Sequence, residues 1–221
     1  MNIVVVAPHP DDETLGCGGT LLRHIAAGDR VHWLIATEMT REVGFSGEAI
    51  AKRDREIADV AAGYGLTAVH RLGFPSTTLD ATPRAVLVRS IGDAFRKIEP
   101  TVVYLPHHGD SHTDHAVLHE ATIACTKWFR YPSIREVLAY ETPSETAWGV
   151  GRHVEPFVPT LYIDIAATLG RKLEILATYE GEIGAFPFPR SVDAVRALAM
   201  LRGSEAGVGA AEAYVLVHAI R

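Results

Sequence analysis

The sequence is poor in cysteine, with only Cys17 and Cys125 among 221 residues. Two cysteines cannot form the disulfide framework of a small secreted domain, and no Cys-x-x-Cys pair suggests a redox or zinc motif. We expect both to pack as small apolar side chains. No basic, apolar leader precedes the first strand, so we expect a reducing, cytoplasmic setting.

Long apolar runs and basic blocks are also missing. No stretch approaches the ~18 apolar residues that span a bilayer, so we expect no membrane insertion. The formal net charge is −6 and no cluster of Lys or Arg stands out, which disfavours a nucleic-acid partner held by phosphate contacts. The composition, 48% hydrophobic and 22% charged, is that of an ordinary globular protein with a sizeable core.

What the chain does have is an alternation of β-branched apolar runs with helical patterns. Strands followed by helices of this length indicate parallel βαβ units. The predicted fold class is therefore α/β, a three-layer α/β/α sandwich around a Rossmann-like, mostly parallel sheet. In the first part of the chain we expect strands at 3–7, 31–36, 68–72 and 101–105, and helices at 15–27, 48–64, 83–98 and 114–129.

After Pro132 the pattern loosens. No linker rich in Pro, Gly or Ser and no repeat separates this part, so residues 1–221 are interpreted as a single domain whose C-terminal extension builds over the sheet edge. Here we expect strands at 136–141, 160–165 and 212–219, and helices at 167–180 and 192–202.

Residues 8–13, Pro-His-Pro-Asp-Asp-Glu, directly follow the first buried strand. The carboxyl end of such a strand lies at the edge where open α/β proteins bind ligands. An imidazole and two adjacent carboxylates are costly to desolvate unless they bind something. The segment therefore predicts a metal site with a spare carboxylate, while Glu13 is interpreted as an acid that complements the helix dipole.

A second cluster, residues 107–115, follows the strand at 101–105 in the same way. Loops after two parallel strands can meet at one sheet edge. His9, Asp12 and His115 would then supply two imidazoles and one carboxylate. That donor set suits Zn²⁺, Fe²⁺ or another divalent metal with open positions for water and substrate.

The neighbouring polar residues predict a division of labour. Asp11 is placed to act as general base beside a metal-activated water. His112 can stabilise an oxyanion or protonate a leaving amine. Asp114 can orient His112 or His115. A His-x-x-x-His pair of His115 with His119 stays open, although the Glu of a metalloprotease motif is absent.

At these residues the chain resembles the LmbE-like (PIG-L) N-acetylglucosaminyl deacetylase family. Residues 7–13 and the following Gly16-Cys-Gly-Gly19 are similar to its signature, and 112–115, His-Thr-Asp-His, is similar to its His-Pro-Asp-His motif. Thr113 stands where proline is usual. Further similar stretches are Arg53-x-x-Glu56, 189–191, 202–204 and 211–214.

The resemblance implies zinc-dependent removal of an acetyl group from a small-molecule N-acetylated amino sugar, by a protein that forms homo-oligomers. It implies His9, Asp12 and His115 as ligands, Asp11 as base and His112 as electrostatic or acid partner.

Three more residues are candidate substrate contacts. Arg53 either binds substrate or is a solvated helix charge. Glu38 binds a sugar hydroxyl or is an ordinary loop acid, and His108 lines the pocket or only ends a strand.

Two other functions remain open. The Gly-Cys-Gly-Gly run opens a helix, and Glu38 lies about 20 residues further on, as in a dinucleotide-binding fingerprint, but Leu21 stands where that fingerprint requires glycine. A non-enzymatic interaction module with structural zinc is the second alternative. Structural sites usually have four protein ligands that include cysteine, and neither cysteine stands with the His-Asp cluster.

Overall fold

The computed structural model describes residues 1–149 and 156–220, which contain one seven-stranded sheet and six α-helices. The strands are β1 (Asn2–Ala7), β2 (Arg30–Glu38), β3 (Ala68–Pro75), β4 (Val102–Pro106), β5 (Glu136–Tyr140), β6 (Leu161–Asp164) and β7 (Ala211–Ala219). The helices are α1 (Asp12–Ala26), α2 (Gly47–Tyr64), α3 (Arg84–Ile98), α4 (Thr113–Ala124), α5 (Leu169–Leu176) and α6 (Val192–Ala206), with short 3₁₀ helices η1 (Leu79–Ala81) and η2 (Thr146–Trp148).

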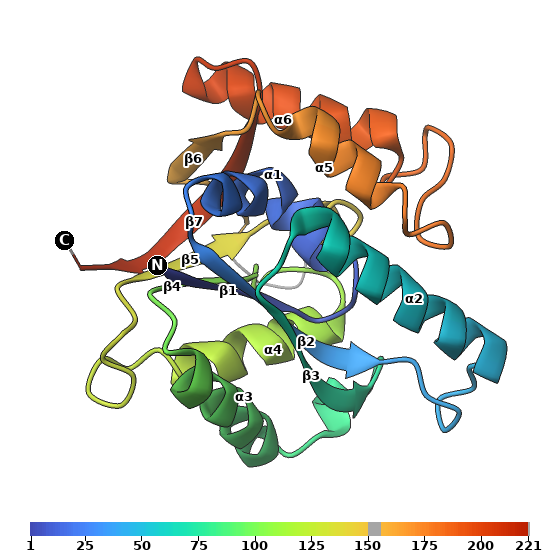
Figure 1. The fold of residues 1–221 in the computed structure, drawn as a ribbon, viewed down its shortest axis with the longest axis vertical. Helices are drawn as coiled ribbons and strands as arrows, with labels where there is room; N and C mark the ends of the chain where they lie inside the picture. The colour runs from blue at the N-terminus through green and yellow to red at the C-terminus, as the bar shows by residue number, and fades with distance from the viewer. Residues whose placement is uncertain (150–155, 221) are drawn as a thin grey trace.

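The sheet is mostly parallel and has the strand order β3-β2-β1-β4-β5-β7-β6 (Figure 1). Strands β1 to β5 pair in parallel, whereas β7 runs antiparallel to both β5 and β6. The chain leaves β1 toward β2 and β3 and returns to β4 on the other side of β1. The carboxyl ends of β1 and β4 therefore flank a topological switch point, where ligands bind in such folds.

Helices cover both faces of the sheet, so the predicted three-layer α/β/α sandwich is confirmed. Helices α1, α2, α5 and α6 lie on one face, and α3 and α4 on the other (Figure 1). Alternate side chains of β1 enter opposite cores: Ile3 and Val5 face one, Val4 and Val6 the other. All four are fully buried, and each such burial contributes about 1.5–3 kcal/mol.

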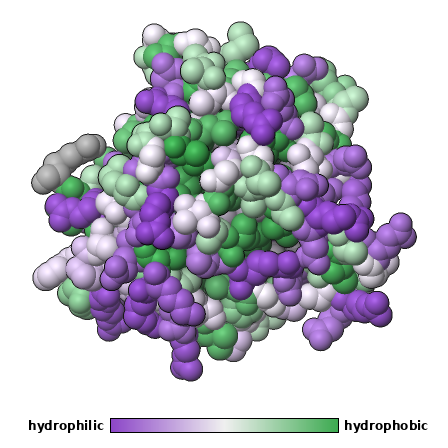
Figure 2. Space-filling view, in the orientation of Figure 1, coloured by the Kyte–Doolittle hydropathy of each residue, from purple (hydrophilic) through white to green (hydrophobic). Residues whose placement is uncertain are grey.

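Helix α2 is amphipathic and is capped at both ends. Its buried residues include Ile57, Val60 and Tyr64, while hydrophilic residues gather on the side of the molecule where α2 lies (Figure 2). The helix begins at Ser46, whose hydroxyl accepts the Ala49 N–H, and ends at Gly65 in the left-handed conformation. Both residues are of the kind preferred at their ends of a helix.

The glycines of α1 serve close packing. A Cβ at Gly16 would overlap the ring of Tyr140 on β5, and one at Gly19 would lie 2.7 Å from Cβ of Ile165. The run therefore lets α1 lie directly on its neighbours, which accounts for it without a dinucleotide. Cys17 and Cys125 are buried free thiols in the two cores, as expected.

Two predicted helices are too long. Helix α4 ends at Ala124 instead of 129, because the chain turns there and the N–H groups of Arg130 and Tyr131 donate to the Lys127 carbonyl. Helix α5 covers 169–176 instead of 167–180. Beyond its end, Tyr179 is fully buried and its hydroxyl donates to Glu13, so tertiary contacts override the helical pattern.

Candidate functional site

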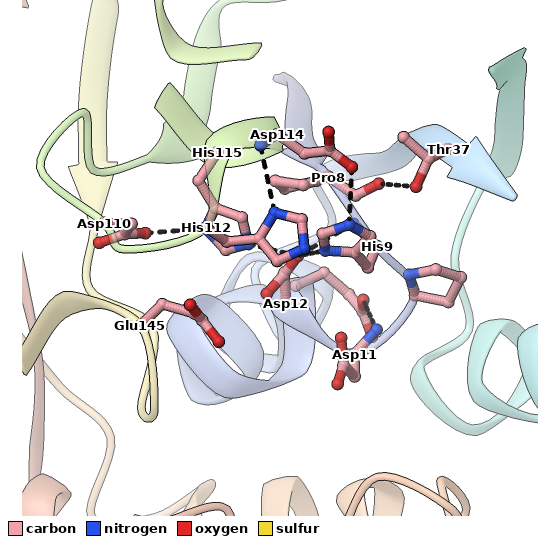
Figure 3. Close-up of polar contacts among 12 residues, drawn as sticks. Pro8, His9, Asp11, Asp12, Thr37, Asp110, His112, Asp114, His115 and Glu145 are labelled. Atoms are coloured by element: carbon pink, nitrogen blue, oxygen red, sulfur yellow. Dashed lines mark hydrogen bonds and ion pairs between the residues drawn. The ribbon is translucent and has the colours of Figure 1, made fainter. Parts of the chain in front are cut away.

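The three predicted metal ligands lie together at the switch point. His9 follows β1, Asp12 begins α1, and His115 lies in the first turn of α4. Nδ1 of His9 and Nε2 of His115 each lie 3.4 Å from the same oxygen, Oδ2 of Asp12 (Figure 3). One ligand atom from each residue lies within 4.8 Å of the others, so this group can hold a metal ion.

Each imidazole is held from behind by a second carboxylate. Nε2 of His9 lies 3.1 Å from Asp114, and Nδ1 of His115 lies 2.8 Å from Asp110. A carboxylate on the far nitrogen of a histidine is the usual support of a metal ligand, because it fixes the ring and leaves the near nitrogen free.

The prediction that Asp114 orients His112 or His115 is wrong for its side chain. The Asp114 carboxylate accepts the N–H groups of Thr77 and Leu79, at 2.8 and 3.0 Å. These bonds draw it away from the neighbours on its own helix and toward His9. Asp110, which the sequence alone did not single out, supports His115 instead.

The charges of the group favour a cation. Burial lowers the pKa of His9, but hydrogen bonds to Asp114 and Asp12 outweigh it and raise that pKa to about 9. Burial likewise lowers the pKa of His115, yet the charge of Asp12 and the bond to Asp110 raise it to about 10. Without a metal, His9 and His115 therefore each hold an extra proton beside the buried Asp12 carboxylate. A divalent cation would replace these two positive charges.

Asp11 stands at the start of α1 but does not cap it. As the N-cap residue it has a φ of 133° and makes no side-chain capping bond. Its N–H donates instead to Oε2 of Glu13 at 3.0 Å, so Glu13 supports the helix start as expected. Strain of this kind is typical of functional positions, and here it leaves the Asp11 carboxylate free to face the pocket.

The environment of Asp11 keeps its carboxylate a good proton acceptor. Burial and the charge of Asp12 raise the pKa of Asp11 well above its usual range, while Arg190 opposes that shift. Nη1 of Arg190 donates to Oδ2 of Asp11 at 2.9 Å. A carboxyl with a raised pKa is a stronger base than an ordinary aspartate.

His112 is the N-cap residue of α4, and Nδ1 of its ring accepts the Asp114 N–H at 3.1 Å. In the neutral ring the proton is therefore on Nε2. Burial and the charges of His9 and His115 lower the pKa of His112, which favours the neutral form. Thr113 occupies the first helical position, where proline is merely favoured, so the Thr113 departure leaves this arrangement intact.

Comparisons with known proteins identify the family of this chain. A family model described as PIG-L, GlcNAc-PI de-N-acetylase, matches residues 4–126. The chain belongs to the PIG-L family. A 1D-myo-inositol 2-acetamido-2-deoxy-alpha-D-glucopyranoside deacetylase of Rhodococcus jostii is 28% identical, over 84% of this chain and 82% of its own.

Two solved structures extend the similarity over the whole PIG-L chain. A conserved protein of Thermus thermophilus has a TM-score of 0.80 at 28% identity, covering 100% of this chain and 96% of its own. The N,N'-diacetylchitobiose deacetylase of Pyrococcus horikoshii has a TM-score of 0.78 at 21% identity, covering 98% and 83%; that likeness is one of fold. In the part of the chain that the structure describes, no helix has both the length and the apolar character to cross a membrane.

A cavity of about 230 Å³ opens beside the His-Asp group of this PIG-L chain. Arg53 and Glu38 line it, as predicted. His108 is not among its lining residues. Its ring packs between those of His107 and His119, with centroids 4.5 and 5.3 Å away. His119 bonds to the Pro106 carbonyl. It belongs to neither of the two possible metal groups found among the described residues, which are His9-Asp12-His115 and His9-His112-Asp114.

Arg53 and Glu38 are both engaged with the protein. Arg53 is buried, donates to the Pro10 carbonyl at 2.8 Å and pairs with Glu182, so it holds the turn that carries the acids. Glu38 pairs with Arg71 at 2.8 Å.

The sequence did not predict three charged lining residues of the PIG-L pocket: Arg190, Glu182 and Glu145. For Arg190 there was a signal, because residues 189–191 resemble a family segment. No pattern within that segment indicates which site it reaches.

Proposed function

We propose that the chain is a metal-dependent hydrolase that removes the acetyl group from an N-acetylglucosamine-type sugar or conjugate. The observation that carries this proposal is the convergence of His9 Nδ1 and His115 Nε2 on Asp12, with the Asp11 carboxylate beside them in an open pocket. Membership of the PIG-L family and the deacetylase activity named for its relatives support it.

His9, Asp12 and His115 would hold the metal, and we propose zinc because two imidazoles and one carboxylate are a common catalytic zinc set. Fe²⁺ suits the same donors. When bound, the metal supplies a Lewis acid that polarises a carbonyl and lowers the pKa of water.

Asp11 takes the proton from the attacking water. Arg190 binds Oδ2 of Asp11 and so orients the carboxylate, leaving Oδ1 to accept. His112 directs its Nε2–H at the acetyl oxygen and stabilises the negative charge that develops there. The proton then passes from Asp11 to the departing amine, giving acetate and a free amino sugar, and Asp11 is a carboxylate again.

Acetate release from a panel of N-acetylated sugars and conjugates tests the proposal. We expect the zinc-loaded protein to release acetate, to lose that activity on chelation and to regain it with zinc. His115→Ala is expected to lose both bound metal and activity. Activity that persists in fully demetallated protein contradicts the mechanism, and a zinc-loaded protein that releases no acetate from any member of the panel contradicts the function.

A further inference from the structure

Glu145 differs from the other carboxylates that line the pocket. Within residues 1–149 and 156–220 the bonded partners of its carboxylate are two hydroxyl groups: Ser111 donates to Oε2 at 2.6 Å and Ser144 to Oε1 at 3.2 Å. No ion pair to Glu145 is found in that part of the chain. In Figure 3 its carboxylate is turned toward the His-Asp group, so it presents a negative charge to the pocket.

The arginines of the pocket are already neutralised. Arg53 pairs with Glu56 and Glu182, and Arg190 pairs with Asp11 and Glu182. Three carboxylates thus offset two guanidinium groups. Apart from the proposed metal, a phosphate or carboxylate on a substrate would have to displace one of these pairs to gain a cation.

The size of the cavity brings the rest of a substrate close to Glu145. A volume of about 230 Å³ is below the ~300 Å³ at which ordinary ligand pockets begin. The pocket therefore takes the acetamido end of a substrate, and the remainder extends across the rim. Half-buried Glu145 belongs to that rim, and exposed Trp148 stands three residues beyond it.

We propose that Glu145 is a specificity-determining residue that selects uncharged N-acetylated glycosides and rejects those bearing phosphate or carboxylate groups. This inference rests on the proposed deacetylase function. Glu145 accepts a hydrogen bond from a substrate hydroxyl, whereas it repels an anion at the same place. Rejection by an unpaired like charge is a common source of specificity.

The first test compares acetate release from the methyl glycoside of N-acetylglucosamine and from N-acetylglucosamine 6-phosphate, using the zinc-loaded protein. We expect kcat/KM to be about tenfold or more higher for the neutral substrate, the order expected for one charge several ångströms from another. Added salt should lower the ratio of the two kcat/KM values, because it screens the repulsion between Glu145 and the phosphate. Equal or preferred turnover of the phosphate overturns the inference while leaving the deacetylase function standing.

Charge-removing variants locate the effect. Glu145→Gln keeps the side-chain shape and should reduce the neutral-to-anionic ratio severalfold. Glu174→Gln removes the same charge from an exposed position on α5, where Glu174 pairs with Arg171, and should leave the ratio unchanged. An equal change in both variants, or none in Glu145→Gln, contradicts the assignment to Glu145.

A binding measurement separates this inference from the proposed activity. Calorimetry with glucosamine methyl glycoside and glucosamine 6-phosphate, both lacking the acetyl group, needs no turnover. We expect the ligand without phosphate to bind more tightly to the wild-type protein, and Glu145→Gln to reduce the difference. Tighter or equal binding of the phosphate, or no binding of either, overturns the selection whatever the acetate assay shows.

Discussion

Oδ2 of Asp110 accepts a hydrogen bond from Nδ1 of His115 at 2.8 Å, and both groups are buried. This bond fixes which nitrogen of His115 is free to bind metal. Asp110→Ala should therefore lower zinc affinity about 10- to 100-fold, the usual effect of losing such a support.

Competition with a chromogenic chelator measures the effect of Asp110→Ala. Asp110→Asn keeps an acceptor oxygen and should fall between wild type and Asp110→Ala. Exposed Asp93, which pairs with Arg96 on α3, gives the control Asp93→Ala. Wild-type affinity in Asp110→Ala would show that the bond does not support the metal site.

Asp11 lies against Arg190 and does not belong to the possible metal groups found in residues 1–149 and 156–220. Asp11→Asn removes the proposed base while keeping the size of the side chain. We expect kcat to fall about 10²- to 10⁴-fold and zinc content to stay at the wild-type level. Metal analysis alongside acetate release checks both; loss of zinc would instead identify Asp11 as a ligand.

Lys172 and Glu212 form a buried ion pair at 2.7 Å, and neither residue lines the pocket. The Glu212 carboxylate also accepts the N–H groups of Gly19 and Thr20, so it joins α1 to β7. Glu212→Ala leaves a buried cation and two backbone donors without their partner. The free energy of unfolding should fall by about 3–5 kcal/mol.

Urea denaturation measures the loss in Glu212→Ala, with exposed Glu174→Gln as control. The double variant Lys172→Met, Glu212→Gln should lose less than the sum of the two single changes, because it leaves no unpaired charge. A loss below about 1 kcal/mol in Glu212→Ala would show that the pair contributes little.

His32 and His70 share a hydrogen bond of 3.2 Å between neighbouring strands β2 and β3. Burial lowers the pKa of both rings. The charges of His70 and Arg30 lower the pKa of His32 further, and the charge of Lys97 lowers that of His70. As pH falls below ~6.5, histidines of the unfolded chain take up protons that this folded pair resists. Stability from the pair is therefore present at neutral pH and lost toward acid pH.

His70→Gln removes one of these two groups, so the fall in unfolding free energy between about pH 7 and pH 5 should be smaller than in wild type. Chelated protein is used throughout, so that the titration of the metal site cancels in the difference. His218→Gln, at an exposed position on β7, is the control. A steeper acid loss in His70→Gln would reverse the sign of the argument.

The sequence predicted the part of the site that two short segments of the chain supply. Residues 8–13 and 112–115 follow the ends of adjacent parallel strands, so strand prediction alone brings His9, Asp12 and His115 to one edge. The spacing of three also placed His112 beside His115, and their ring centroids are 5.5 Å apart.

Contacts between distant segments set the rest. Arg190 reaches Asp11 across 179 positions of the chain, and no periodicity or motif spacing encodes such a meeting. The partner of Asp114 was predicted wrongly for a related reason: proximity in sequence favoured His112 and His115, but the backbone of residues 77–79 holds its carboxylate toward His9.

The position of β7 also matters while the protein is being made. It is the last of the described strands to leave the ribosome, yet it lies between β5 and β6. A nascent chain can align β1 to β5 during translation, since N-terminal parts fold first, but β6 pairs with β7 alone in the described sheet and must wait for it. The half that carries the His-Asp group can therefore assemble before the half that contributes Glu182 and Arg190 to the pocket.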